Sequence, residues 1–137
     1  MPDRGLAANV CGEQVRLALL EARPAGLTAR QLVAATGLSL YHVRKGILYI
    51  REVSAMANHT PLIWTYAGGY AFASSPDDWI AYECSRLRTE LTRIGRFLSA
   101  TVAPHAALTP EEEWIKLVLG QLNVVQTALT LVNKAGV

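Results

Sequence analysis

A short polar segment brings together side chains that can bind an anion or the edge of a nucleic-acid base. It holds a hydroxyl, a phenol, an imidazole and two cationic groups: Ser39, Tyr41, His42, Arg44 and Lys45. An arginine guanidinium can donate two parallel hydrogen bonds to guanine, and a lysine ammonium can reach a phosphate. The chemistry that this segment predicts is therefore recognition of a polyanion.

The sequence shows no residue set for catalysis or for holding a metal. It contains no phosphate-binding loop, no glycine-rich dinucleotide motif, no HExxH and no GxSxG, and Cys11 and Cys84 are far apart. The acidic pairs and triplets at residues 77–78 and 111–113 follow helix-cap residues and are explained by the helix dipole. We therefore expect no enzyme activity and no cofactor.

The basic residues are concentrated in the first part of the chain. Residues 1–60 hold seven bases and four acids, whereas residues 61–137 hold six bases and seven acids, which together give the net charge of +2. We find no apolar run of membrane-spanning length and no signal-peptide pattern. We therefore expect a cytoplasmic protein with no membrane contact, no evident small-molecule ligand and an anionic partner for its N-terminal half.

The polar segment lies on the second of two short helices that are predicted to meet at a tight turn. Thr28 caps a helix over residues 29–36, Gly37 permits the chain to reverse, and Ser39 caps a helix over residues 40–51. Helical spacing predicts that the inward residues of this second helix are Leu40, Val43, Ile47 and Leu48, and that the outward ones are Tyr41, His42, Arg44 and Lys45.

A helix over residues 12–22 is predicted to precede this pair, and two short aromatic-rich strands follow it, near residues 62–66 and 70–73. Gly68 and Gly69 between the strands favour a two-residue turn, which would pair Thr65 with Phe72. That register places four residues on one face of the hairpin: Ile63, Thr65, Tyr70 and Phe72.

This order of elements resembles the winged helix-turn-helix domain of bacterial and phage transcription regulators. The resemblance covers about residues 12–75 and lies in the β-hairpin and in six residues of the helix pair: Leu32, Gly37, Leu38, Ser39, Val43 and Ile47. It implies binding of specific double-stranded DNA, usually as a homodimer, with the helix over residues 40–51 in the major groove. The residues then placed to contact DNA are Thr28, Arg30, Ser39, Tyr41, His42, Arg44 and Lys45. Three features depart from the pattern, namely Val33 where a small residue is usual, Gly46 inside the helix over residues 40–51, and a hairpin tip without Lys or Arg.

The C-terminal part of the chain is predicted to form two long antiparallel helices, over residues 77–102 and 110–134, linked through Ala103–Leu108. Ser75 and Thr109 are predicted to cap them. Both helices carry apolar residues at alternating spacings of three and four. The second also has an additional apolar row: Trp114, Leu117, Val124, Ala128, Leu131 and Ala135. This surplus either packs on the winged helix of the same chain or pairs with the helical hairpin of a second chain. We expect the second, with contacts from Leu87, Leu91, Ile94, Leu98, Val118, Leu122, Val125 and Leu129.

These patterns predict a mainly α protein. Residues 1–75 would form a winged helix-turn-helix of three helices and a β-hairpin, and residues 76–137 a helical hairpin for dimerisation. The expected function is a DNA-binding transcription regulator, a repressor by occlusion or an activator through polymerase contact. A protein-interaction module built on a winged helix, or a plasmid or phage origin-binding protein, remains an alternative.

Overall fold

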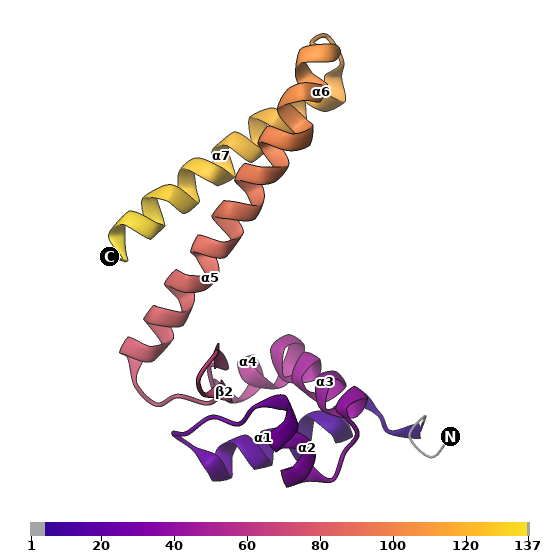
Figure 1. Cartoon of the computed structure of the whole chain (residues 1–137), viewed down its shortest axis with the longest axis vertical. Coiled ribbons are helices and arrows are strands. Elements are labelled where there is room, and N and C mark those ends of the chain that lie inside the picture. Colours follow the sequence, from indigo (N-terminus) through magenta and orange to yellow (C-terminus); the bar gives the residue numbers. More distant parts are fainter. Residues whose placement is uncertain (1–4, 137) are drawn as a thin grey trace. The chain divides into compact units, whose positions relative to one another are not determined.

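The computed structural model describes residues 5–136, and this part of the chain is mainly helical with one small antiparallel β-hairpin (Figure 1). The helices are α1 (Ala8–Ala22), α2 (Ala29–Thr36), α3 (Leu40–Tyr49), α4 (Ala55–Asn58), α5 (Pro76–Phe97), α6 (Ala103–Leu108) and α7 (Glu113–Ala135). The strands are β1 (Ile63–Thr65) and β2 (Gly69–Ala71). Two π-helical turns, η2 (Ile50–Ser54) and η3 (Leu98–Val102), join α3 to α4 and α5 to α6.

The chain divides into two units, and the division falls inside α5. The N-terminal unit extends to Tyr82 and the C-terminal unit starts at Glu83, whereas the sequence placed the boundary at residue 75. The first turns of α5 belong to the N-terminal unit because the Trp79 indole N–H donates to the Ala73 carbonyl at 2.7 Å. Trp79 and Tyr82 also pack on the buried face of the hairpin.

The predicted starts and turn of the helix pair are confirmed. The Thr28 hydroxyl accepts from the Gln31 N–H at 3.2 Å, while the Gln31 side-chain oxygen accepts from the Thr28 N–H at 2.8 Å. The chain leaves α2 through Gly37 with a φ of 75°, in the left-handed region that favours glycine. The Ser39 hydroxyl accepts from the His42 N–H at 3.2 Å and caps α3. These local bonds hold α2 and α3 on either side of a short turn.

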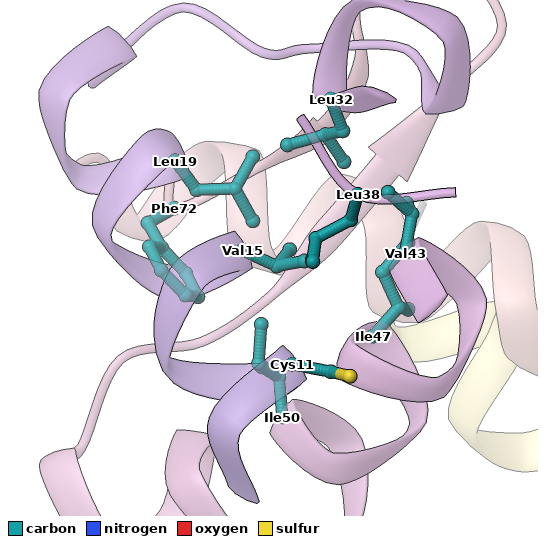
Figure 2. Packing of buried hydrophobic residues seen from close by; sticks show 9 residues of the cluster. All are labelled: Cys11, Val15, Leu19, Leu32, Leu38, Val43, Ile47, Ile50 and Phe72. Atoms are coloured by element: carbon teal, nitrogen blue, oxygen red, sulfur yellow. The ribbon is translucent and has the colours of Figure 1, made fainter. Parts of the chain in front are cut away.

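The N-terminal unit has a closed apolar core (Figure 2). Nine buried residues from α1, α2, the turn, α3, η2 and the segment after β2 meet there: Cys11, Val15, Leu19, Leu32, Leu38, Val43, Ile47, Ile50 and Phe72. The backbones of α1 and α3 come together at Gly46, where a Cβ atom would lie 2.6 Å from the Cys11 carbonyl oxygen. Gly46 is therefore required for this helix contact rather than for a bend.

The buried face of α3 is rotated from the predicted one. Leu40 and Leu48, predicted to point inward, are 41% and 52% exposed, whereas His42, predicted to point outward, is 1% exposed. Because Gly46 carries no side chain, α1 packs on the side of α3 that holds Gly46 and His42. Periodicity located Val43 and Ile47 correctly but could not show which flank α1 would cover.

The β-hairpin has a different register from the predicted one. Its pairs are Ile63 with Ala71, Trp64 with Tyr70 and Thr65 with Gly69, around the three-residue loop 66–68. The Thr65 hydroxyl accepts from the Gly68 N–H at 2.9 Å and closes this loop. The prediction that Thr65 faces Phe72 was wrong, and so was the shared face, because an altered register moves side chains between faces.

The hairpin is fixed to the segment between α1 and α2. Leu27 donates its N–H to the Tyr70 carbonyl at 2.8 Å and accepts from the Tyr70 N–H at 2.9 Å. Ile63 and Ala71 pack with Ala73 on one side, while Phe72 enters the main core. The hairpin is thus held at a set position beside α2.

In the C-terminal unit, the helix that begins as α5 continues through η3 and α6 to Leu108. The predicted stop at Ala103–Pro104 was wrong, because Pro104 lies in the first turn of α6, where a missing N–H is tolerated. The link to α7 is therefore residues 109–112. Thr109 does not cap α7 as predicted, since its hydroxyl donates to the His105 carbonyl at 3.2 Å.

The C-terminal unit buries little. Its fully buried apolar side chains, among the residues that the structure describes, are Leu98, Val102 and Ile115. These three lie near the link between α6 and α7, and Ile94, Ala106, Val118, Leu119 and Leu122 pack partly against them. At the other end of the unit, the Cys84 thiol donates to the Gly136 carbonyl at 3.7 Å.

Candidate nucleic-acid interface

The outward face of α3 presents one aromatic and one cationic side chain at helical spacing. Tyr41 is 68% exposed and Arg44 is also exposed. They lie three residues apart in the first turns of α3, after the Ser39 cap, so their side chains share one face of the helix. Both residues are exposed as predicted.

His42 does not belong to this face. Its ring is buried, and neither ring nitrogen has a hydrogen-bond partner within residues 5–136. Tyr41 lies beside it, with the two ring centroids 5.3 Å apart at an edge-on angle of 61°. The prediction that His42 contacts a base or phosphate was therefore wrong, since the packing of α1 against α3 covers the imidazole.

Lys45 is only partly available. Its side chain is half-buried, and its ammonium donates to the Leu6 carbonyl at 2.8 Å, before the start of α1. Lys45 thus ties α3 to the N-terminal segment, whereas Arg44 is exposed and has no ion-pair partner among residues 5–136. Ser39 is half-buried and its hydroxyl is used as the helix cap.

Arg51 is a further exposed cation near the Tyr41–Arg44 face, and its position was not predicted from the sequence. It follows α3 in η2, is exposed, and its guanidinium carbon lies 5.7 Å from the centroid of the Tyr70 ring. This stacking holds a cation between α3 and the β-hairpin. Its position seven residues after Arg44, two helical turns along, was the signal that could have found it.

A shallow groove of about 380 Å³ separates the start of α2 from the β-hairpin. Its lining comprises the N-terminal turn of α2 and the aromatic residues of the strands: Thr28, Ala29, Arg30, Trp64, Thr65, Tyr66, Gly69 and Tyr70. The capping box uses the N–H groups of Thr28 and Gln31, so Ala29 and Arg30 carry the donors that remain at this helix start. The predicted residues Thr28 and Arg30 therefore border this groove.

The hairpin tip carries aromatic rings in place of cations. Trp64 and Tyr66 meet edge-on with ring centroids 4.7 Å apart, and Tyr66 is 95% exposed. A side chain that is so exposed and so apolar gains from a contact that removes it from water. The tip is thus suited to shape or stacking contacts rather than to ion pairs.

The predicted dimer residues have mixed positions in the C-terminal unit. Leu98 is buried within its own chain, and Ile94, Val118 and Leu122 pack against the same cluster. Leu87, Leu91 and Leu129 are half-buried, and Val125 is 40% exposed. For Leu98 the predicted contact with a second chain is wrong, because its own helical hairpin already covers it.

No group of three or more metal-ligating side chains occurs among residues 5–136. One helix in the same range, Glu113–Ala135, is long and apolar enough to cross a membrane by length and composition, and few of its residues are buried.

Comparison of the chain with protein-family models, with curated proteins and with solved structures finds no match.

Proposed function

We propose that the N-terminal unit is a winged helix-turn-helix and that the protein is a sequence-specific DNA-binding transcription regulator that acts as a homodimer. The observation that carries this proposal is the exposure of Tyr41 and Arg44 on the first turns of α3. The helix stands directly after the left-handed turn at Gly37, over a closed core. In this class of domain, that end of the recognition helix reads base edges in the major groove.

The surrounding residues supply contacts to phosphates. Arg30 and the free N–H groups at the start of α2 form a site for an anion at a helix N-terminus. Arg51, held against Tyr70, provides a second cation on the hairpin side of α3. Arg44 then donates to a guanine and Tyr41 contacts a neighbouring base or sugar. Phosphate contacts fix the position of the domain, and base contacts select the sequence.

Selection of bound duplexes from a random library tests this proposal and returns the site. With the selected duplex, we expect Arg44→Ala to weaken binding roughly 10- to 100-fold and to relax the preference for one base pair. Arg88→Ala removes the same charge from the exposed surface of α5 and serves as the matched control. Equal affinity of the wild type and of Arg44→Ala would exclude α3 as the reading helix.

One observation favours a second candidate, a winged helix that binds a protein. Leu40 and Leu48 are exposed on the same helix as Tyr41, and Met56 in α4 is 75% exposed. The surface therefore includes apolar side chains as well as cations. A protein partner would bind it with little dependence on salt. DNA binding instead weakens steeply as salt rises, with a slope set by the number of phosphates contacted.

A further inference from the structure

The C-terminal unit lacks a core of its own along most of α7. The side of α7 that faces α5 contains Ile115, Leu119, Leu122 and Leu129, but also Gln126 and Asn133. The amide atoms of Asn133 are buried and have no hydrogen-bond partner in the described part of the chain. Full burial is confined to three side chains near the link to α6. A unit of this size needs more buried apolar surface, or an oligomer, to be stable.

The opposite side of α7 carries the apolar surface that the unit does not bury. We call it the outward row: six large apolar side chains that are 40–65% exposed, namely Trp114, Leu117, Val124, Val125, Leu131 and Val132. The small residues Ala128 and Ala135 and one amide, Gln121, lie between them. No charged residue interrupts this row, because Lys116 and Lys134 lie on a third side of the helix.

We propose that the outward row of α7 binds the outward row of a second copy of this chain, so that each α7 is covered by α5 on one side and by the α7 of the other copy on the opposite side. This inference assigns the contact surface of the proposed homodimer. It rests on that part of the proposed function and does not depend on DNA binding. It differs from the sequence-based expectation, which assigned the contact to residues such as Leu98 and Ile94 that the hairpin itself uses.

The exposed area is sufficient for a stable pair. Given the exposed fractions of the outward row, roughly 500 Å² of apolar surface per chain is free, or ~1,000 Å² for two chains, which reaches the lower limit of a specific interface. With the smaller residues and the amide included, this side of α7 repeats at alternating spacings of three and four, which is the pattern of helices that pair with each other: Trp114, Leu117, Gln121, Val124, Ala128, Leu131 and Ala135.

A second copy fits this helix better than a lipid bilayer does. Between Lys116 and Lys134 the helix carries six polar side chains on several sides: Gln121, Asn123, Gln126, Thr127, Thr130 and Asn133. Within hydrocarbon the amides among them would lose their hydrogen bonds with water. A helical partner leaves the polar side of α7, with Asn123 and Thr127, in water and covers only the outward row.

Sedimentation of the full chain tests the interface through a matched pair of variants. We expect the mass of two chains for the wild type. Leu117→Glu with Val124→Glu places two charges in the outward row and should raise the dissociation constant at least ~100-fold, giving single chains. Asn123→Glu with Thr127→Glu adds the same charges to the polar side of α7 and should keep two chains. A wild type of single-chain mass, or both double variants behaving alike, would overturn the proposal.

Thiol protection provides a second measurement that does not depend on the stability of a charged variant. In a Cys84→Ser background, Val124→Cys should react with a thiol reagent more slowly as protein concentration rises, whereas Thr127→Cys should react at a constant rate. Equal behaviour of the two cysteines overturns the proposal. So does flotation of single chains with phosphatidylcholine–phosphatidylglycerol vesicles, which would assign the row to a bilayer. A single-chain wild type that still binds the selected duplex refutes this interface and leaves DNA binding intact.

Discussion

The two units of this protein bury their apolar residues in different ways. In the N-terminal unit, nine side chains from six segments form one cluster, and even the polar His42 is enclosed. In the C-terminal unit, three side chains are buried at one end, while six large apolar residues of α7 remain exposed. The first unit has a closed core within one chain, whereas the second leaves a wide apolar surface exposed.

This difference separates two kinds of exposed residue. On α3, Tyr41 and Arg44 are exposed above a closed core, and we propose that they contact DNA. On α7, Leu117 and Val124 are exposed because one neighbouring helix cannot cover so wide an apolar side. The same property, an exposed large side chain, therefore predicts a ligand-binding surface in one unit and an assembly surface in the other.

The largest expected effect comes from truncating matched leucines in the two units. Leu32→Ala removes a fully buried side chain from the N-terminal core and should lower the free energy of unfolding by about 2–5 kcal/mol. Leu91→Ala removes a half-buried side chain from α5 and should cost no more than ~1 kcal/mol. Urea unfolding followed by circular dichroism measures both. Equal losses would contradict the contrast between a closed and an open core.

A smaller effect of opposite sign is expected at His42. Its buried ring nitrogens have no partners among the described residues, so His42→Leu removes a desolvation penalty and should stabilise the protein by roughly 1 kcal/mol. Affinity for the selected duplex should stay unchanged, because the ring does not reach the surface. Thermal unfolding and a binding titration measure the two quantities. A loss of affinity without a gain in stability would return His42 to the DNA-contacting set.

The smallest effect concerns an exposed ion pair on α1. Hydrogen bonds from Arg16, at 2.9 Å and 2.6 Å, hold the pKa of Glu13 below its ordinary range. The pair then contributes about 0.2–0.5 kcal/mol, present at neutral pH and lost as the pH falls through the lowered pKa of Glu13. The wild type should therefore lose this contribution to thermal stability between neutral and acidic pH, whereas Glu13→Gln should not. An unchanged difference would show that the pair contributes nothing.

Helix caps and turns were predictable from the sequence, whereas the side on which one helix packs against another was not. The Thr28 capping box, the turn at Gly37 and the Ser39 cap depend on neighbouring residues, and all three are present in the structure. The burial of His42 depends on where α1 approaches Gly46, which periodicity within α3 cannot show.

The helix continues through Pro104 because a π-helical turn, η3, precedes it, and no sequence pattern near Pro104 predicts such a turn. Which apolar residues of α7 face α5 and which face solvent likewise depends on how the helix is rotated about its own axis. The sequence therefore placed Tyr41 and Arg44 on the exposed side of α3, as the structure has them, did not indicate the exposed Arg51, and assigned the dimer contact to residues such as Leu98 that the hairpin uses itself.

Hydrogen exchange of the full chain, at two protein concentrations and with or without the selected duplex, measures the DNA-binding and the dimer surface separately. We expect the duplex to slow exchange in residues 40–54 at either concentration. Higher concentration alone should slow exchange in residues 114–132 and leave the N-terminal unit unchanged. Protection of residues 114–132 that does not depend on concentration, or duplex protection outside α3 and its neighbours, would contradict the division into a DNA-reading unit and an assembly unit.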